Sequence, residues 1–467
     1  MALDIVIMAA GKGTRMHSSL PKVLHVLAGR SLLQHVLQAA ASLQADSIIA
    51  ITGHGAQTVE SSVTAPRLKF VRQMPQLGTG HAVLQACPAL HDDGTTLILN
   101  GDVPLIEPAT ARALVQACGG VRLALLTVEL EQPSGYGRIL RSADVPQSGA
   151  SDSAPVRGIV EERDASPAQR TIREVYTGAM AAPTAQLKRW LAQLTNDNSQ
   201  GEYYLTDVVA MAAAQGVPIV TTPATDETEV LGVNTPAQLA HLERRVQARQ
   251  AQALMLSGVR LADPARFDLR GHLRCGQDVE IDINCLFEGD VELGDGVHVG
   301  AHCVIRNAVI DRGAVIHPFT HIDGDAQGVR VGAGARVGPY ARLRPGAVLG
   351  EDVHIGNFVE VKNTTLGRGS KANHLAYLGD ASLGERVNFG AGSITANYDG
   401  TNKHRTLIGN DVQVGSNCVL VAPLTIGDGA TVGGGSTVAK TVPAGQLTVA
   451  RARQTTLPGW VRPTKPR

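Results

Sequence analysis

The sequence is poor in aromatic residues and carries no net charge. Phe, Trp and Tyr make up only 3% of the 467 residues, and Lys plus Arg equal Asp plus Glu at 42 each. The low aromatic content argues against a conventional globular core throughout the chain. The charge balance does not favour nucleic acid or an anionic membrane as a partner.

Paired cysteines and long apolar runs are also missing. None of the six cysteines stands in a Cys-x-x-Cys pair, which favours reduced thiols in a reducing compartment. No run of about 18 apolar residues is present, so no transmembrane helix is expected. The apolar start contains Asp4 and lacks a basic leader and a cleavage site, so it is interpreted as a buried strand and not a signal peptide. A cytoplasmic protein is therefore expected.

Glycine, in contrast, is abundant and unevenly distributed. Of the 51 glycines, 19 precede position 235 and 32 follow it, which predicts two different architectures. The first part alternates apolar strands with helical patterns, typical of a mostly parallel sheet that is covered by helices and binds ligands at the carboxyl ends of its strands. The expected strands are 5–9, 48–52, 68–71, 96–99 and 123–128, the expected helices include 32–43 and 79–86, and 142–156 is expected to be a surface excursion.

A helix is predicted between the two parts. Thr235 can cap its start, Pro236 suits the first helical position, and Gly258 ends it. Its apolar face carries Leu239, Leu242 and Val246. The expected organisation is a first domain at 1–234, a linker helix at 235–257 and a second domain at 258–467.

Beyond this helix the apolar period becomes six residues. One apolar column consists of Val331, Val337, Leu343, Leu349, Ile355 and Val361. Its phase changes near Thr365, and the six-residue period resumes at Ile408, Val414, Leu420, Ile426, Val432 and Val438. A second column consists of Ala335, Ala341, Ala347, Val353 and Val359. A period of six fits neither a helix nor a heptad and is the signature of a parallel β-helix with glycines at its corners. Such a solenoid can be a scaffold without catalytic residues.

A glycine-rich turn follows the first predicted strand. Its backbone N–H groups at Gly11 and Gly13 could approach phosphate oxygens, and Arg15 and Lys22 would add positive charge. By itself such a turn is more often an ordinary strand-to-helix connection, and it matches neither a Walker A loop nor the dinucleotide fingerprint. Asp102, after a later strand, could be a metal ligand or a turn carboxylate.

The order of the motifs resembles that of nucleotidyltransferases that make sugar nucleotides. The motifs are GKGTRM (11–16), LPKVL (20–24), QLGTGHA (76–82), GDVPL (101–105), SGYGRI (134–139), GIVEERD (158–164), NSQGEYYLTD (198–207) and GVN (232–234). Over nearly the whole chain the sequence resembles the bifunctional bacterial N-acetylglucosamine-1-phosphate uridylyltransferase/glucosamine-1-phosphate acetyltransferase family. The resemblance implies a Rossmann-like α/β nucleotidyltransferase domain, a linker helix and a left-handed β-helix of hexapeptide repeats.

The resemblance also implies roles for residues of the first domain. Arg15 and Lys22 would bind the UTP phosphates and assist catalysis, and Asp102 and Asn234 would hold Mg²⁺. The implied contacts with UTP and UDP-N-acetylglucosamine are Met8, Ala9, Ala10, Gly11, Lys22, Gln73, Gly78, Thr79, Asn100, Gly101, Asp102, Gly137, Glu161, Tyr176 and Asn234. The attacking phosphate oxygen is already ionised, so the barrier is electrostatic and suits a metal with cationic side chains. Asn100 and Tyr176 depart from the family, which usually has Tyr and Asn there.

Polar residues interrupt the repeats of the second domain. Arg344 and Lys362 are 18 residues apart, as are successive members of the set Tyr398, Ser416 and Gly434. The resemblance implies three hexapeptides per coil, or about 18 residues, so each set should stack on adjacent coils. Stacked cations would repel each other unless an anion such as a sugar phosphate lay between them, although a solvated surface column remains an alternative.

His374 lies where the phase of the repeats slips, which predicts a loop that bulges from the coil. An isolated histidine is more often a surface residue, but the resemblance makes it the general base that neutralises the attacking amine. The proximity of their motifs suggests Glu360 as the residue that orients the imidazole. The implied contacts with glucosamine-1-phosphate are Arg344, Lys362, Tyr377 and Asn388. The implied contacts with acetyl-CoA are Ala391, Asn397, Tyr398, Ser416, Gly434 and Arg451.

The predicted function is therefore synthesis of UDP-N-acetylglucosamine in two steps, acetyl transfer to glucosamine-1-phosphate and then Mg²⁺-dependent uridylyl transfer from UTP. A homotrimer with sites between subunits is implied by the resemblance. One alternative is a monofunctional pyrophosphorylase whose repeats only oligomerise or regulate. Another is a trimeric scaffold that senses nucleotide without turnover.

Overall fold

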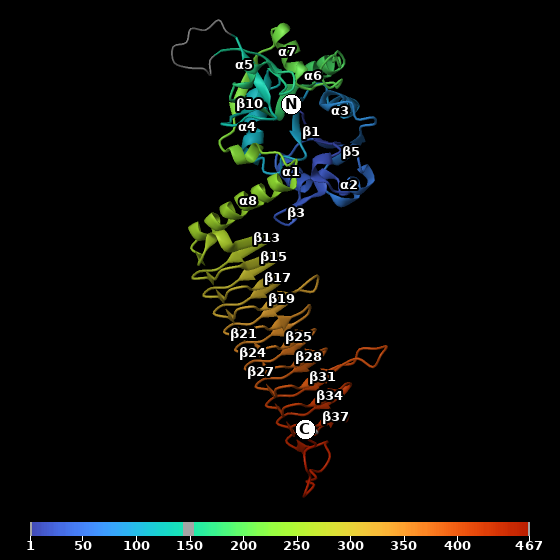
Figure 1. The fold of residues 1–467 in the computed structure, drawn as a ribbon, viewed down its shortest axis with the longest axis vertical. Helices are drawn as coiled ribbons and strands as arrows, with labels where there is room; N and C mark the ends of the chain where they lie inside the picture. The colour runs from blue at the N-terminus through green and yellow to red at the C-terminus, as the bar shows by residue number, and fades with distance from the viewer. Residues whose placement is uncertain (1, 143–153, 466–467) are drawn as a thin grey trace. The chain divides into compact units, whose positions relative to one another are not determined.

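The computed structural model describes residues 2–142 and 154–465 (Figure 1). The chain divides into two compact units, Met1–Val246 and Gln247–Arg467, and the boundary falls inside helix α8 (Pro236–Leu256). Most of the predicted excursion at 142–156 lies outside the described residues. None of the described helices is long and apolar enough to cross a membrane.

The first unit is built on one mostly parallel sheet, as predicted. Strand β1 pairs in parallel with β4 and β6, whereas β10 runs antiparallel between β6 and β7. The antiparallel hairpin of β8 (Gly137–Arg141) and β9 (Val156–Val160) extends from β10. The seven strands of the main path are, in spatial order, β11 (Ile219–Pro223), β7 (Leu123–Glu129), β10 (Glu174–Pro183), β6 (Thr95–Asn100), β1 (Leu3–Ala9), β4 (Ser47–Thr52) and β5 (Leu68–Arg72).

Helices cover both faces of this sheet. Along β1, Ile5 and Ile7 pack on one face and Val6 packs on the other, which explains the continuous apolar run. One face carries α1 (Leu32–Ala41), α2 (Ala56–Ser62) and α4 (Pro108–Cys118), and the other carries α3 (Thr79–Ala86), α6 (Thr184–Leu191) and α7 (Asp207–Ala214). Leu242 of α8 is buried in a small cluster of the first unit with Leu27 and Val233.

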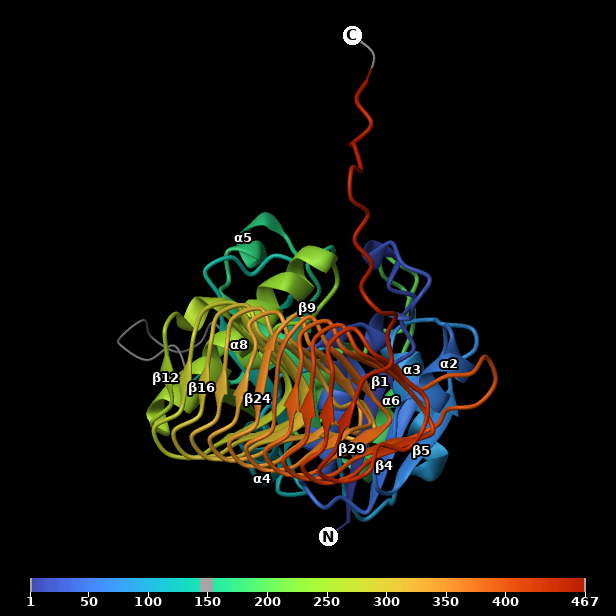
Figure 2. The ribbon, with the colours of Figure 1, turned by 90° about the horizontal axis from the view of Figure 1, so that it is seen from below.

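The second unit is the predicted left-handed parallel β-helix, whose stacked coils are seen in Figure 2. Every member of the predicted six-residue columns is buried. One face of the coil consists of β12 (Arg260–Leu261), β14 (Glu280–Ile281), β16 (His298–Val299), β18 (Val315–Ile316), β21 (Arg336–Val337), β24 (His354–Asn357), β27 (Lys371–His374), β30 (Asn388–Phe389), β33 (Gln413–Val414), β36 (Thr431–Val432) and β38 (Leu447–Thr448). The buried positions of the axis are mostly aliphatic, and Phe267, Phe287 and Phe389 are aromatic residues within the same core.

The other two faces form one continuous sheet, because the first strands are long enough to extend over both. Its strands are β13 (Phe267–Cys275), β15 (Cys285–Leu293), β17 (Val304–Ile310), β19 (His321–Asp323), β20 (Val329–Val331), β22 (Arg342–Leu343), β23 (Val348–Leu349), β25 (Glu360–Lys362), β26 (Thr365–Leu366), β28 (Tyr377–Gly379), β29 (Ala381–Leu383), β31 (Ile394–Ala396), β32 (Thr406–Ile408), β34 (Val419–Val421), β35 (Leu424–Ile426) and β37 (Thr437–Val438).

The coils are not all 18 residues long. Arg336 pairs with His354, 18 positions later, but His354 pairs with Lys371, only 17 positions later. Asn388 pairs with Gln413, 25 positions later, because residues 397–405 leave the coil as a projecting loop (Figure 1). The phase slip near Thr365 is thus a one-residue shortening, and the protruding loop lies further along the chain.

Candidate active sites

The turn after β1 brings a lysine toward the sheet edge. Gly13 has a φ of +63°, and a Cβ on it would lie 2.6 Å from the Cβ of Lys22. Only glycine therefore allows the segment of Lys22 to pack against the turn. The turn and Lys22 together border the carboxyl end of the sheet, where α/β proteins bind ligands.

Two adjoining cavities lie at this edge. The larger, of about 580 Å³, is lined by most of the predicted nucleotide contacts: Met8, Ala9, Ala10, Gly11, Arg15, Lys22, Gln73, Gly78, Thr79, Asn100 and Asp102. The smaller, of about 290 Å³, is lined by Met8, Arg15, Thr79, Asn100, Asp102, Gly137, Glu161, Tyr176 and Asn234. Gly101 lines neither cavity, and its N–H donates to the Met8 carbonyl at 2.9 Å.

The predicted metal ligands face one common position. The Lys22 ammonium donates to the Asp102 carboxylate and, at 3.1 Å, to Oδ1 of Asn234. Arg15 donates to the same Asn234 oxygen at 2.9 Å. The described residues contain no group of three or more His, Cys, Asp or Glu side chains that could hold a metal. One carboxylate and one amide oxygen around a shared cation position fit Mg²⁺, which keeps waters and takes phosphate oxygens as further ligands.

Glu161 and Tyr176 form the inner wall of the smaller cavity. Oε1 of Glu161 accepts a hydrogen bond of 2.9 Å from Thr206, but burial raises the pKa of Glu161. Burial, followed by the charge of Glu161, raises the pKa of Tyr176 well above its ordinary value. The Tyr176 hydroxyl is buried and has no hydrogen-bond partner within residues 2–142 and 154–465. Tyr176 therefore offers a protonated, unsatisfied hydroxyl beside a carboxyl group.

Gly178 explains how one of the two departures from the resembled family, Asn100, fits at this edge of the sheet. A Cβ on Gly178 would lie 1.9 Å from Nδ2 of Asn100, so the amide packs against the bare backbone of β10. Gln76 also lines the larger cavity, and its Nε2 donates to the Ala10 carbonyl at 3.1 Å. Gln76 is a cavity residue beyond those predicted from the sequence, although it begins the motif QLGTGHA (76–82).

In the second unit, His374 is exposed at the end of β27 and pairs in register with Asn357. The predicted bulging loop at this position is wrong, because His374 belongs to a regular coil that is one residue short. Its Nδ1 lies 2.9 Å from Oδ1 of Asn357. An amide oxygen only accepts, so Nδ1 carries the proton and Nε2 keeps a lone pair for a base. The orienting partner is thus Asn357 and not Glu360.

Three of the predicted acetyl-CoA contacts follow His374 in one column. The N–H of Gly392 donates to the backbone carbonyl of His374 at 3.3 Å. On the next two coils, the N–H of Asn417 donates to the Ala391 carbonyl at 2.8 Å, and the N–H of Gly435 donates to the Ser416 carbonyl at 2.8 Å. The column of residues just before the corner is therefore His374, Ala391, Ser416 and Gly434. Arg451 lies beside it, since its Nη1 donates to the Gly434 carbonyl at 2.7 Å.

Tyr398 is not part of this column. It lies in the loop 397–405, is 62% exposed, and donates to the Gly400 carbonyl at 2.6 Å. The predicted stacking of Tyr398 on Ser416 is wrong, since the loop lengthens the coil to 25 residues, whereas the step from Ser416 to Gly434 is correct.

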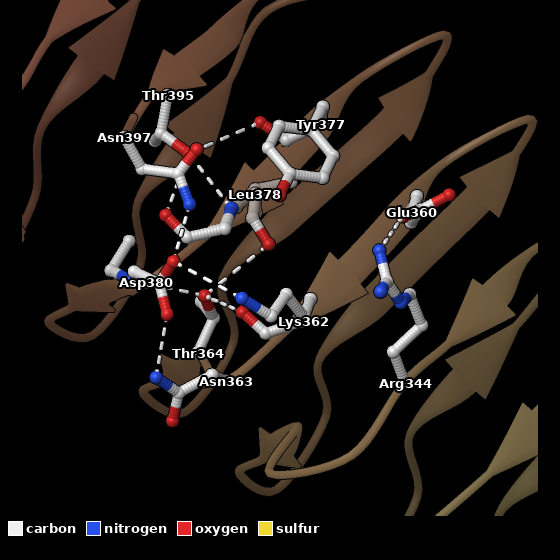
Figure 3. A network of polar contacts seen from close by, with 12 residues as sticks. Arg344, Glu360, Lys362, Asn363, Thr364, Tyr377, Leu378, Asp380, Thr395 and Asn397 are labelled. Atoms are coloured by element: carbon white, nitrogen blue, oxygen red, sulfur yellow. Dashed lines mark hydrogen bonds and ion pairs between the residues drawn. The ribbon is translucent and has the colours of Figure 1, made fainter. Parts of the chain in front are cut away.

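Arg344 and Lys362 lie on adjacent coils, as predicted, but each has its own carboxylate (Figure 3). Arg344 donates to Glu360 at 2.7 Å, and Lys362 donates to Asp380 at 3.3 Å. No external anion is thus required to hold the two cations together. Burial opposes the charge of Lys362, yet the hydrogen bond and negative charge of Asp380 raise its pKa overall.

Lys403 and Asp380 were missed by the sequence analysis. The contact with Lys362 and its positive charge lower the pKa of Lys403. Lys403, in the projecting loop, therefore lies beside one of the predicted phosphate contacts. Tyr377 is on the same face of the coil as Lys362, in register with Glu360. Asn388 pairs with Lys371 on the neighbouring face and is not grouped with them.

Family comparisons agree with the division into a nucleotidyltransferase part and a hexapeptide-repeat part. Residues 5–143 match a MobA-like NTP transferase domain, 269–372 match the GMPPB C-terminal domain, and 405–440 match bacterial transferase hexapeptide repeats. A protein of Methylibium petroleiphilum named bifunctional protein GlmU is 71% identical, over 100% of both chains. The chain belongs to the GlmU family. Another GlmU protein, from Paracidovorax citrulli, is 64% identical over 99% of both chains.

The resemblance to bifunctional enzymes that the motifs predicted is confirmed by these relatives. Among solved structures, a UDP-glucose pyrophosphorylase complexed with UDP-glucose aligns with a TM-score of 0.44 and 15% identity, over 53% of this chain and 100% of its own. Both GlmU relatives extend over the whole length of this chain, including the two candidate sites.

Proposed function

We propose that this GlmU family member makes UDP-N-acetylglucosamine in two reactions, one in each unit. In the second unit, the amine of glucosamine-1-phosphate takes the acetyl group of acetyl-CoA. In the first, N-acetylglucosamine-1-phosphate attacks the α-phosphate of UTP and releases pyrophosphate. The supporting observation is a relationship of 71% identity over the full chain to a bifunctional protein. We assign the reactions to residues 258–467 and 1–234, with 235–257 as the linker.

For uridylyl transfer, the larger cavity would hold the nucleotide and the smaller one the sugar. Arg15, which lines both cavities, and Lys22, which lines the larger one, would bind the phosphates and balance the charge that builds up at the α-phosphate. Mg²⁺ bound by Asp102 and Asn234 would neutralise phosphate charge and help to align the leaving pyrophosphate. Lys22 would then transfer its hydrogen bonds from these two side chains to a phosphate oxygen.

For acetyl transfer, Nε2 of His374 would take a proton from the attacking amine. The amine nitrogen forms a bond to the thioester carbon, and the C–S bond then breaks, so that the electron pair leaves with CoA sulfur and is protonated. The column of Ala391, Ser416 and Gly434 supports this assignment, because it provides small residues next to His374 on successive coils. A backbone N–H near Ala391 would stabilise the tetrahedral oxyanion.

A homotrimer with its acetyltransferase sites between subunits fits the separation of Asn388 from Arg344, Lys362 and Tyr377, since a second copy could bring these groups together. Mass photometry of the full chain tests the trimer.

The function itself is tested by incubating the full chain with glucosamine-1-phosphate, acetyl-CoA, UTP and Mg²⁺. We expect UDP-N-acetylglucosamine by mass spectrometry. Omission of UTP should stop the reaction at N-acetylglucosamine-1-phosphate, and omission of acetyl-CoA should abolish the acetylated products. Formation of the nucleotide sugar from supplied N-acetylglucosamine-1-phosphate, without any acetylation of glucosamine-1-phosphate, would instead identify a monofunctional pyrophosphorylase.

A further inference from the structure

One buried carboxylate in the β-helix connects residues that are assigned to different substrates. Asp380 follows β28, and its side chain is only 9% exposed. Its Oδ1 accepts a hydrogen bond of 2.6 Å from Asn363. Its Oδ2 accepts from both Lys362, at 3.3 Å, and Asn397 (Figure 3). A single oxygen atom is therefore shared by a lysine that is assigned to the sugar phosphate and an asparagine that is assigned to acetyl-CoA.

The carboxylate stays charged in this position. Burial alone would raise the pKa of Asp380, but hydrogen bonds from Asn363, Asn397 and Lys362 outweigh it and lower the pKa. Asn397 is itself buried and begins the projecting loop, whose far end returns through a hydrogen bond of 2.8 Å from the N–H of His404 to the Asn397 carbonyl. Asp380 thus fixes the base of the loop that carries Lys403 and Tyr398.

We propose that Asp380 is a positioning residue that couples the binding of the two acetyltransferase substrates. This inference rests on the proposed acetyl transfer. A sugar phosphate that binds Lys362 draws the ammonium away from Oδ2, whose bond to Lys362 is already long. The oxygen then accepts from Asn397 alone, which strengthens that hydrogen bond and holds the asparagine more firmly for CoA. Linkage requires CoA to tighten sugar-phosphate binding by the same factor.

The coupling can be measured without turnover, because CoA and glucosamine-1-phosphate do not react with each other. Calorimetry on the full chain gives the Kd of CoA with and without saturating glucosamine-1-phosphate. We expect the sugar phosphate to tighten CoA binding about fivefold or more in the wild type. In Asp380→Asn, which keeps the shape but removes the charge, we expect a change of less than about twofold.

Asp411→Asn is the matched control. Asp411 is also at a corner with positive φ and also pairs with a cation, Arg386, but it contacts none of the assigned substrate residues. It should show the wild-type factor. If Asp380→Asn does not fold, as judged by circular dichroism, Asn397→Ala replaces it, because the loss of the second donor must also abolish the coupling.

The proposal is overturned if the wild type shows no coupling, or if a folded Asp380→Asn or Asn397→Ala protein keeps the full factor. These results are independent of the proposed reaction. That reaction fails separately, if the wild type releases no CoA thiol from acetyl-CoA and glucosamine-1-phosphate.

Discussion

Removal of the Tyr176 hydroxyl should stabilise the protein and weaken sugar binding together. The hydroxyl is buried, and the part of the chain that the structure describes gives it no partner. A buried polar group without a hydrogen bond costs about 1–3 kcal/mol, so Tyr176→Phe should gain about 1 kcal/mol in the free protein. For a domain of this size, that gain corresponds to a rise in Tm of about 2–4 °C.

The same substitution should raise the KM for N-acetylglucosamine-1-phosphate, because a hydroxyl in the wall of the smaller cavity would donate to the sugar. Loss of a hydrogen bond of about 1 kcal/mol predicts a roughly fivefold increase, with a small change in kcat. Calorimetric melting and pyrophosphate release measure the two effects.

Tyr204→Phe is the matched control. Tyr204 has the same small exposed fraction as Tyr176, 7%, but its hydroxyl accepts from Gln200 at 2.8 Å and donates to Asp164 at 3.3 Å. That variant should lose stability. A lower Tm for Tyr176→Phe, or an unchanged KM for the sugar phosphate, would refute the reasoning.

Three further predictions concern the two reactions. His374→Ala should lower the rate of CoA release by about 10²–10⁴-fold, as expected for loss of a general base, and leave pyrophosphate release unchanged; equal acetylation would exclude His374 as the base. Chelation of Mg²⁺ with EDTA should stop pyrophosphate release but not CoA release, and a loss of both would contradict separate sites. Because burial raises the pKa of Glu161, this side chain becomes protonated at a higher pH than a free carboxyl group does. The KM for N-acetylglucosamine-1-phosphate should therefore rise as the pH falls through the raised pKa of Glu161. In Glu161→Gln the rise in KM at low pH should disappear, and a rise that persists would show that another group titrates.

Much of the fold follows from local patterns. Strands buried on both faces and the six-residue columns are visible in the sequence, because each inward position must be aliphatic whatever its neighbours are. Antiparallel β10 was not expected, since a strand that is buried on both faces has the same composition in either direction.

The candidate sites were only partly predictable. Spacing placed Arg344 over Lys362 correctly, but it failed for Tyr398 because the loop 397–405 adds residues that do not advance the coil. Motif proximity suggested Glu360 for His374, whereas pairing between coils brings Asn357 there instead. Neighbours across coils depend on exact coil length, which is set by corners and loops and not by composition.

The column that begins at His374 sets the distance between the ends of an acetyl-CoA molecule bound along it. Successive coils are about 4.8 Å apart, so three steps from His374 to Gly434 extend about 14 Å. An extended pantetheine arm laid along these coils would have its thioester at the imidazole and its nucleotide end toward Arg451. Deletion of residues 416–433, one complete coil of regular length, would preserve the packing of the axis but shorten this track by one strand spacing, which would separate recognition of the acetyl end from recognition of the nucleotide end.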